Sequence, residues 1–380
     1  MSIVFVGGRF DKDGGKQSSI ANVIFSYCFD EMLRNRHALV SGNKIKVING
    51  GSLRDLHDAF GLAVNENTKL VLWFAEVDNA ESKESIDNIK KCNPKVILVA
   101  SKSKIGRYYT FPDLIMKMLH RKVNLLVEFS MSMHVSGRYI ASVYDPLGNV
   151  WANGIGDMPE VGRIIAKRSM FLLGMKRIQS ERNHYLDKET VPIGGEFLEI
   201  VRESGARFAE LLPKPSDSPI KRFVGNASFR CASGFPSFRG GNGETWVSRR
   251  NVNKEGISKK DFVPVLLRDG VVEYGISGQS EEAKPSVDAP IHCELYRLYP
   301  MINYILHGHV YLDGEKVTNS PIPCGALEEV DEIFHAMPSF NCRSFLLNLR
   351  GHGFIACVDK IEGLRGLRFI ARPMPECQQI

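Results

Sequence analysis

The sequence predicts an α/β protein with two domains: an N-terminal Rossmann-like, doubly wound parallel sheet and a C-terminal α+β domain with a largely antiparallel sheet. In the first half, near-continuous apolar runs alternate with helical segments, which is the pattern of parallel strands buried on both faces. In the second half, short strands and helices follow each other without that rhythm. A chain of 380 residues is long enough for two domains of ordinary size.

The elements of the first half follow from this alternation. The apolar runs predict strands at residues 2–8, 44–51, 69–77, 95–101 and 123–130. The segments between them predict helices at 17–34, 52–61, 80–92 and 111–120. Residues 138–154 alternate on either side of "DPLGN", which predicts an antiparallel hairpin. A helix at 158–177 and a charged boundary at 178–193 follow, so we expect domains at 1–180 and 190–380.

The second half begins with a predicted helix at 195–213. Short β-branched and aromatic runs predict strands at 226–232, 245–250, 262–268, 271–275, 304–312, 343–350 and 354–359. Three segments between or after these strands predict helices at 288–300, 324–337 and 361–373.

Composition limits the classes of function. The 43% hydrophobic and 24% charged fractions are those of a soluble globular protein, and no run has the length of a membrane span. Eight cysteines without a CxxC pair indicate free thiols in a reducing compartment, and no signal-peptide pattern is present, so we expect a cytoplasmic protein. The net charge of +6 suits a small anionic substrate, while membranes and nucleic acids are not expected partners.

A glycine-rich segment, "FVGGRFDKDGGKQSSI", joins the first strand to the first helix. Such junctions bind phosphates through loop amides and a helix N-terminus, although the spacing fits neither GxGxxG nor the phosphate-binding loop of nucleotide hydrolases. The candidate ligand-binding residues of this domain are Gly7, Gly8, Gly14, Gly15, Lys16 and Glu76. We expect a nucleotide or nucleoside-sugar site; the alternative is a glycine-rich turn without a ligand.

Two histidines lie one residue apart in the apolar run "YILHGHVYL", residues 304–312. On a strand, the period of two places His307 and His309 on the same face. Two neutral imidazoles on one face are candidate metal ligands, and the alternative is a hydrogen-bonded pair at a half-buried sheet edge.

His352 and Asp288 extend this candidate site. His352 lies between two glycines in "RGHGFIAC", where the backbone can approach a ligand closely. Asp288 lies at the start of a predicted helix, where it either caps the helix or takes part in chemistry. Three imidazoles and a carboxylate form the ligand set of a catalytic zinc site that keeps one position open.

Five motifs in the second half resemble one family in the same order along the chain. They are "GNASFR", "KPSVDAPIHCELYRLYP", "LHGHVYL", "IPCGALEEVDEIF" and "RGHGFIACVDKIEGL". Residues 195–380 therefore resemble the class II aldolase/adducin family, which includes L-fuculose-phosphate aldolase and L-ribulose-5-phosphate 4-epimerase. The resemblance implies a metal-binding α+β domain and a homo-oligomer.

The resemblance also implies a role for each matching residue. The divalent metal, zinc in the first place, would be bound by His307, His309 and His352. Asp288 matches the acid/base glutamate, and Asn226 and Ser286 match residues that bind the substrate phosphate. In such a site the metal polarises a carbonyl and stabilises an enediolate, while the carboxylate moves protons.

Four departures from the family pattern bear on the reaction. Asp288 is one methylene shorter than glutamate, and Val287 replaces a phosphate-binding serine. Arg250 and Asn251 stand where the family has Thr-Gly; Arg250 either binds an anion in their place or belongs to a solvated edge. Residues 310–321 are short and leave little room for the family insert whose tyrosine protonates the leaving group.

The expected function is a divalent-metal-dependent, aldolase-type lyase that acts on a phosphorylated sugar or a related anionic carbonyl compound. One alternative is an epimerase, dehydratase or decarboxylase of the same fold that acts on a nucleotide-derived sugar. Another is a non-catalytic, adducin-like binding or oligomerisation module, which would have no reason to keep all three histidines.

Overall fold

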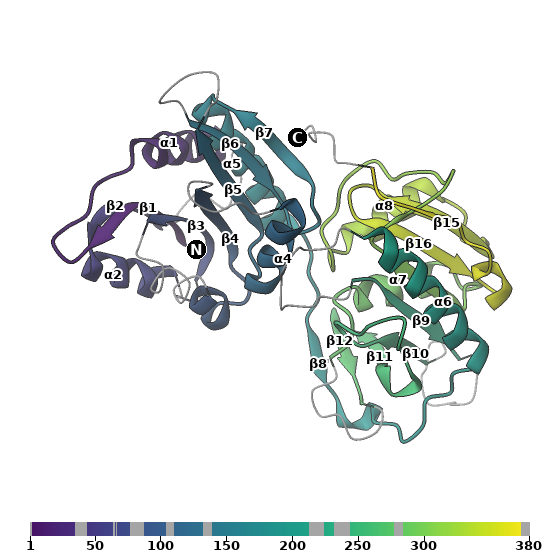
Figure 1. Cartoon of the computed structure of the whole chain (residues 1–380). Coiled ribbons are helices and arrows are strands. Elements are labelled where there is room, and N and C mark those ends of the chain that lie inside the picture. The colour runs from purple at the N-terminus through teal and green to yellow at the C-terminus, as the bar shows by residue number, and fades with distance from the viewer. Residues whose placement is uncertain are drawn as a thin grey trace. The chain divides into compact units, whose positions relative to one another are not determined.

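A computed structural model describes residues 2–34, 44–63, 65, 67–76, 87–103, 110–131, 139–212, 224–231, 244–276 and 284–373. The chain divides into two compact units, one made mainly of Met1–Gly174 and the other mainly of Met175–Pro213 and Lys221–Met374 (Figure 1). No helix within the described ranges is both long and apolar enough to cross a membrane.

The first unit is built on a seven-stranded sheet with the order β2-β1-β3-β4-β5-β6-β7. Its strands are β1 (Ser2–Asp11), β2 (Lys44–Ser52), β3 (Thr68–Glu76), β4 (Ile97–Ser103), β5 (Leu125–Met131), β6 (Tyr139–Tyr144) and β7 (Val150–Ile155). Strands β1 to β5 are parallel, and β6 and β7 form the predicted antiparallel hairpin. The predicted Rossmann-like sheet is confirmed.

Helices cover both faces of this sheet because its central strands are apolar on both faces. The helices are α1 (Ser19–Arg34), α2 (Leu53–Ala63), α4 (Phe111–Arg121) and α5 (Met158–Gly174). Along β1, Ile3 and Phe5 pack in one core with α1 and α5, whereas Val4 and Val6 pack in the other with α2 and α4. Figure 1 shows these helices beside the sheet. The sheet is therefore doubly wound, as predicted.

The second unit holds an eight-stranded sheet with the order β15-β16-β13-β9-β10-β11-β12-β8. Its strands are β8 (Ser180–Arg182), β9 (Asn226–Arg230), β10 (Thr245–Ser248), β11 (Phe262–Arg268), β12 (Val271–Tyr274), β13 (Tyr304–Gly308), β15 (Ser344–Leu349) and β16 (Gly353–Val358). Only the β12–β8 pair among these is parallel, so the prediction of a largely antiparallel sheet is confirmed. The segment 178–193, predicted as a domain boundary, contributes β8 to this sheet.

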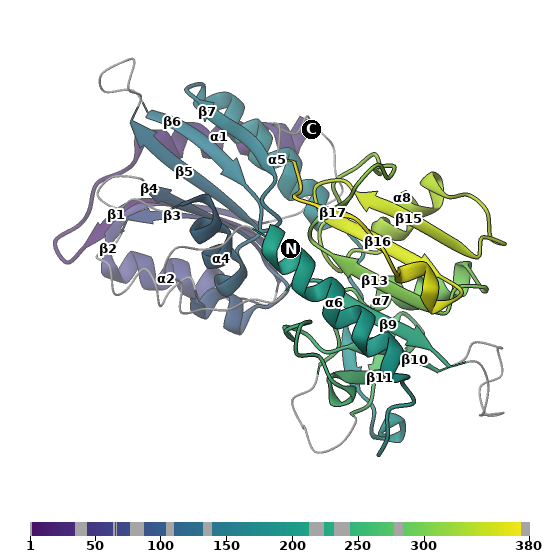
Figure 2. The ribbon, with the colours of Figure 1, turned by 45° about the vertical axis from the view of Figure 1, so that its right-hand side comes forward.

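Three helices cover the second sheet: α6 (Gly195–Leu211), α7 (Ala289–Leu298) and α8 (Glu328–Ala336). On one face, Phe197 and Phe208 of α6 pack against alternate residues of β9, β13 and β16. Figure 2 shows α6 beside β9 and β13. On the other face, Leu295 of α7 and Ile333 of α8 pack against the intervening residues, such as Ile355 of β16. Side chains that alternate along each strand thus fill two separate cores.

Two predicted elements differ in the structure. The helix at 361–373 is wrong: a 3-10 turn, Ile361–Leu364, is followed by β17 (Phe369–Ile370), which pairs with β14 (Tyr311–Leu312). Gly366 adopts a φ of 71°, which ends helical geometry there. The strand at 304–312 is also broken, because β13 ends at Gly308 and β14 belongs to a different, two-stranded sheet.

Candidate metal site

Three segments of the second unit meet at one end of the strands of its sheet. His307 of β13 pairs with Asn226 at the start of β9 and with Ile355 near the start of β16. Because both pairs are antiparallel, the end of β13 lies beside the start of β9 and the loop that precedes β16. That loop contains His352. The sheet register therefore brings together residues that lie far apart in the sequence.

One ring nitrogen of His307, Nε2, has no hydrogen-bond partner among the described residues at this end of the strands. Its side chain is only 2% exposed, and its Nδ1 lies 2.7 Å from the carbonyl oxygen of Phe354. Since a carbonyl can only accept, Nδ1 carries the proton and the Nε2 lone pair is free. Nε2 is buried and has no hydrogen-bond partner. A buried ring nitrogen held in this tautomer is what a metal ligand requires.

His352 is held in a similar way by a carboxylate. Its Nδ1 lies 2.9 Å from Oε2 of Glu329, and both side chains are almost fully buried. Its Nε2 lies 3.1 Å from Sγ of Cys324. The carboxylate orients the ring and directs Nε2 toward the other two histidines, as in the carboxylate–histidine–metal arrangement of many metal sites.

The three imidazoles converge. Ring centroids are 5.2 Å apart for His307 and His309, 4.7 Å for His307 and His352, and 5.0 Å for His309 and His352. One nitrogen from each ring lies within 4.8 Å of the others, which is a group able to hold a metal ion. His309 reaches this position from the bend after β13 rather than from the strand, which corrects the expected geometry of one continuous strand.

Close backbone contacts require glycine around the histidines. A Cβ at Gly353 would lie 2.0 Å from the carbonyl oxygen of Gly308, and one at Gly225 would lie 2.6 Å from that of His307. Real Cβ atoms do not approach a carbonyl so closely, so each glycine allows two chain segments to meet. Gly353 is thus required by a contact between two strands, and the expected close approach of the glycines to a ligand stays a prediction.

Burial and neighbouring groups give the three rings different pKa values. Burial, and next the charge of His352, lowers the pKa of His307 to about 3, and the same two causes hold the pKa of His309 well below its usual range. Burial acts to lower the pKa of His352 too, but Cys324 and Glu329 together raise it well above its usual range. His307 and His309 are thus neutral imidazoles, whereas the thiol of Cys324 and the carboxylate of Glu329 favour the protonated form of His352.

Asp288 does not cap helix α7 with its side chain. Its Oδ2 accepts a hydrogen bond of 2.8 Å from Nδ2 of Asn226, and its Oδ1 accepts one of 2.8 Å from the backbone N–H of Gly325. Ser286 Oγ lies 3.1 Å from the same Asn226 nitrogen. Asp288 also forms a possible metal-binding group with Cys324 and His352. The structure thus brings together three of the predicted residues, Asn226, Ser286 and Asp288, next to the histidines.

The other predicted substrate-binding residues lie on a turn after β10. Arg250 and Asn251 are exposed, and the backbone N–H of Arg250 donates to the carbonyl of Lys284 at 2.9 Å. Asn251 has a φ of 59°, a left-handed conformation that asparagine tolerates, at the position where glycine was expected from the family pattern. Their proposed contact with a substrate anion stays a prediction.

Three residues of this site were missed by the sequence analysis. Glu329 orients His352, Cys324 contacts the same ring, and Lys254 is a buried cation on the turn after β10. Cys324 and Glu329 lie in a motif quoted above, and Lys254 follows Asn251 by three residues, but each residue type alone predicts a solvated surface or a core position. Burial of a charged side chain is the signal that identifies Glu329 and Lys254, and burial becomes visible only after folding.

The glycine-rich loop of the first unit folds back on its own strand. The backbone N–H of Arg9 donates to the carbonyl of Lys16 at 2.8 Å, and that of Gly15 donates to Gly51 at 2.7 Å. A Cβ at Gly8 would lie 2.6 Å from Oδ1 of Asn49, so this glycine is required by packing alone. The turn therefore accounts for Gly8 without a ligand.

The candidate residues of the first unit nevertheless share one end of the sheet. Gly7 and Gly8 in β1 pair with Phe74 and Ala75 in β3, and Glu76 follows at the exposed end of that strand. Helix α1 follows β1 on one face, whereas the segment after β3 packs Ile89 on the other. Such a switch point is where open α/β sheets bind ligands. Gly14 and Lys16 are exposed in the loop beyond.

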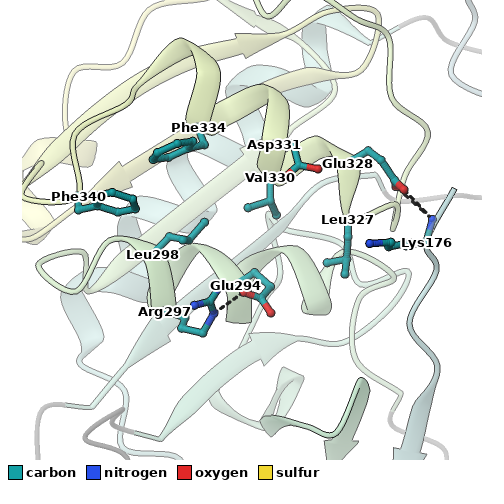
Figure 3. A pocket seen from close by; sticks show the side chains of 10 residues that line it. All are labelled: Lys176, Glu294, Arg297, Leu298, Leu327, Glu328, Val330, Asp331, Phe334 and Phe340. Atoms are coloured by element: carbon teal, nitrogen blue, oxygen red, sulfur yellow. Dashed lines mark hydrogen bonds and ion pairs between the residues drawn. The ribbon is translucent and has the colours of Figure 1, made fainter.

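A separate cavity of about 310 Å³ lies between α7 and α8, as Figure 3 shows. Arg297 and Glu294 of α7 form an ion pair at 2.6 Å on one side, and Glu328 of α8 accepts a hydrogen bond of 2.9 Å from the backbone of Lys176 on the other. None of the predicted metal ligands lines this cavity.

One family model matches part of the second unit. Residues 220–311 match the family model described as "Class II Aldolase and Adducin N-terminal domain", and this range contains His307, His309 and Asp288. The similarity of the C-terminal half to this family, predicted from the motifs, is thereby confirmed. No curated protein sequence matches the chain.

Three solved structures show partial similarity. An L-fuculose 1-phosphate aldolase shares 17% identity with a TM-score of 0.31, covering 45% of this chain and 79% of that one. The C-terminal domain of the coenzyme A biosynthesis bifunctional protein CoaBC shares 13%, with a TM-score of 0.31 and coverage of 45% and 96%. The N-terminal class II aldolase domain of a Thermoplasma acidophilum protein shares 15%, with a TM-score of 0.29 and coverage of 44% and 85%.

Proposed function

We propose, on the premise that residues 220–311 are a class II aldolase-like domain, that this chain is a divalent-metal-dependent lyase of the aldolase type. Its substrate is a phosphorylated sugar or a related anionic carbonyl compound, and its metal is zinc or another divalent ion. The observation that carries the proposal is the convergence of His307, His309 and His352, whose donor nitrogens lie within 4.8 Å of one another.

The donor set fits a divalent ion. Nε2 of His307 is buried without a partner, and the opposite nitrogens of His307 and His352 are held by a carbonyl and a carboxylate. Zinc has four coordination positions in a tetrahedral site, so three imidazole ligands would leave one position for the substrate. When bound, such an ion polarises a carbonyl and stabilises the negative charge that develops on its oxygen.

The chain's own residues supply the remaining functions. Asp288, held by Asn226 and Gly325 at 2.8 Å each, is the proposed group that removes and returns a proton. Asn226 and Ser286 hold the substrate phosphate, and the exposed Arg250 and Asn251 extend that anion site. Oδ1 of Asn226 is buried without a partner, so this amide has acceptor capacity left for a substrate hydroxyl.

The reaction subtype has a second candidate. Only Val310–Pro321 separates the histidines from Ile322, so the chain has little room there for the family's proton-donating insert. An epimerase, dehydratase or decarboxylase of the same fold that acts on a nucleotide-derived sugar fits this short segment about as well. We also propose a homo-oligomer, a cytoplasmic location and a nucleotide or nucleoside-sugar site at the switch point of the first unit.

Metal analysis tests the proposal. Protein purified without chelators should contain about one divalent ion per chain by plasma mass spectrometry. A His309→Ala variant should lose the ion and keep its circular dichroism spectrum, because His309 is only half-buried at the end of β13. His335→Ala, which changes an exposed histidine of α8, is the matched control and should keep the ion.

Two outcomes would contradict this function. Wild-type protein without metal, even after incubation with zinc, manganese or cobalt, would remove its basis. A His309→Ala protein that unfolds while its metal content is unchanged would identify core histidines instead. With metal present, a thermal-shift screen of phosphosugars and nucleotides then separates the enzyme from a module that binds no small molecule.

A further inference from the structure

Lys254 is a buried ammonium group in the second unit. It follows β10 by six residues, and only 3% of its side chain is exposed. Helix α6 accommodates it because Gly205 has no side chain: a Cβ at Gly205 would lie 2.5 Å from that of Lys254. Lysine is almost never buried to this extent unless its charge is compensated. Its surroundings therefore indicate what it binds.

The protein satisfies only part of the hydrogen-bonding capacity of Lys254. Its Nζ donates to the carbonyl of Val252 at 2.8 Å, and no other acceptor contacts it within the residues that the structure describes. An ammonium has three N–H donors, so two are left. Burying a charged group with a single neutral partner is unfavourable, and an anionic ligand would supply the missing acceptors.

Backbone contacts place the turn that carries Lys254 next to the candidate site. The N–H of Ser286 donates to the carbonyl of Ser248 at 3.1 Å, and the N–H of Arg250 donates to the carbonyl of Lys284 at 2.9 Å. These bonds fasten the start of the turn to the segment that runs into Asp288. The turn that carries Lys254 and the segment that carries Asp288 are consequently joined by backbone hydrogen bonds.

Burial and two carboxylates, those of Asp288 and Asp261, influence the pKa of Lys254. Burial lowers its pKa to about 8, and the carboxylates of Asp288 and Asp261 limit the decrease. Asp261 is already paired with Arg249, and Asp288 is held by Asn226 and Gly325. His309 is the remaining titratable group whose pKa responds to Lys254. Neither carboxylate accepts a hydrogen bond from Lys254 in the described structure.

We propose that Lys254 binds an anionic oxygen of the substrate, either a phosphate or a carboxylate oxygen, beside Asp288. That the bound anion is the substrate rests on the proposed function. The anion site itself does not require metal chemistry. The two remaining N–H donors would hold the anion in a fixed orientation.

Titration with inorganic phosphate and with acetate, by calorimetry, tests the inference. Lys254→Met has nearly the same shape without the charge and should weaken binding of at least one anion about tenfold or more, because it removes charge-assisted hydrogen bonds. Lys260→Met removes the same charge from an exposed position and should leave affinity unchanged. Thermal unfolding of both variants verifies that they fold, and phosphate against acetate distinguishes the two sources of the anion.

The pH dependence separates anion binding from a packing role. Wild-type affinity should fall as the pH rises through about 8, because the ammonium loses its proton there. A Lys254→Arg variant should keep binding the anion to higher pH, since a guanidinium stays protonated. A structural role would give neither the decrease nor the rescue.

Metal-loaded and chelator-treated proteins are titrated in parallel. Lys254-dependent anion binding in protein that takes up no metal would support the anion site and contradict the proposed lyase. Lys254→Met that binds both anions as tightly as wild type would overturn the inference, and so would a wild-type protein that binds neither.

Discussion

Glu329 shows how much a single side chain of this site depends on its surroundings. It is fully buried, its Oε2 lies 2.9 Å from Nδ1 of His352, and its Oε1 has no partner. Its neighbours Glu328, Asp331 and Glu332 have the same charge in the same helix but are at least partly exposed. The run "EEVDE" therefore predicts a solvated acidic face, and only burial distinguishes the one residue that orients a candidate ligand.

A Glu329→Gln change tests this role at the scale of one residue. The amide no longer provides a carboxylate for Nδ1 of His352, so we expect metal affinity to fall about 10- to 100-fold. Competition against a chelating dye measures this affinity. Asp331→Asn, on the exposed side of the same helix, is the control and should bind metal like the wild type. Equal affinity in all three proteins would show that Glu329 does not act through His352.

The elements were predictable where one periodicity governs a segment. Along β1, alternate residues enter two cores, which the apolar run predicted. The final segment was not predictable in this way. Leu364 and Leu367 are buried beside Gly366, which has a φ of 71°. Apolar residues spaced by three fit a helix and a folded-back strand equally well, and the contact with β14, which no local pattern encodes, decides between them.

Gly353 provides a prediction at the scale of an element. In Gly353→Ala, the new Cβ would lie 2.0 Å from the carbonyl oxygen of Gly308, so β13 and the start of β16 must separate. We expect the free energy of unfolding to decrease by about 1–3 kcal/mol, the usual range for overpacking. Gly256→Ala, where a Cβ meets nothing within 4 Å, is the control for chemical denaturation. A Gly353→Ala protein as stable as this control would mean that the strands tolerate the separation.

The whole molecule consists of two units with separate hydrophobic cores, and the three candidate metal ligands, His307, His309 and His352, lie in the second unit. A ligand that binds the folded state stabilises the unit that binds it, by about 2.7 kcal/mol at a hundred times its dissociation constant. Adding metal to chelator-treated protein should therefore raise the melting temperature of the second unit alone.

Calorimetry combined with hydrogen exchange measures this effect. Peptides from β13 and β16 should gain protection from exchange on metal addition, whereas peptides from β1 and β3 should not change. His309→Ala should show neither effect. A metal-dependent increase in the protection of β1 would be incompatible with the assignment of the site to the second unit.

The sequence by itself determined the two kinds of sheet, the order of most of their elements and the choice of His307, His309 and His352 as candidate ligands. These features are local, because periodicity and short motifs are properties of neighbouring residues. Only the tertiary structure decided that β13 ends before His309, that Asp288 is held by Asn226 rather than capping its helix, and that Glu329 and Lys254 are buried. The physical reason is that burial and sheet register arise from contacts between segments far apart in the chain, and these contacts determine which charges lose their water.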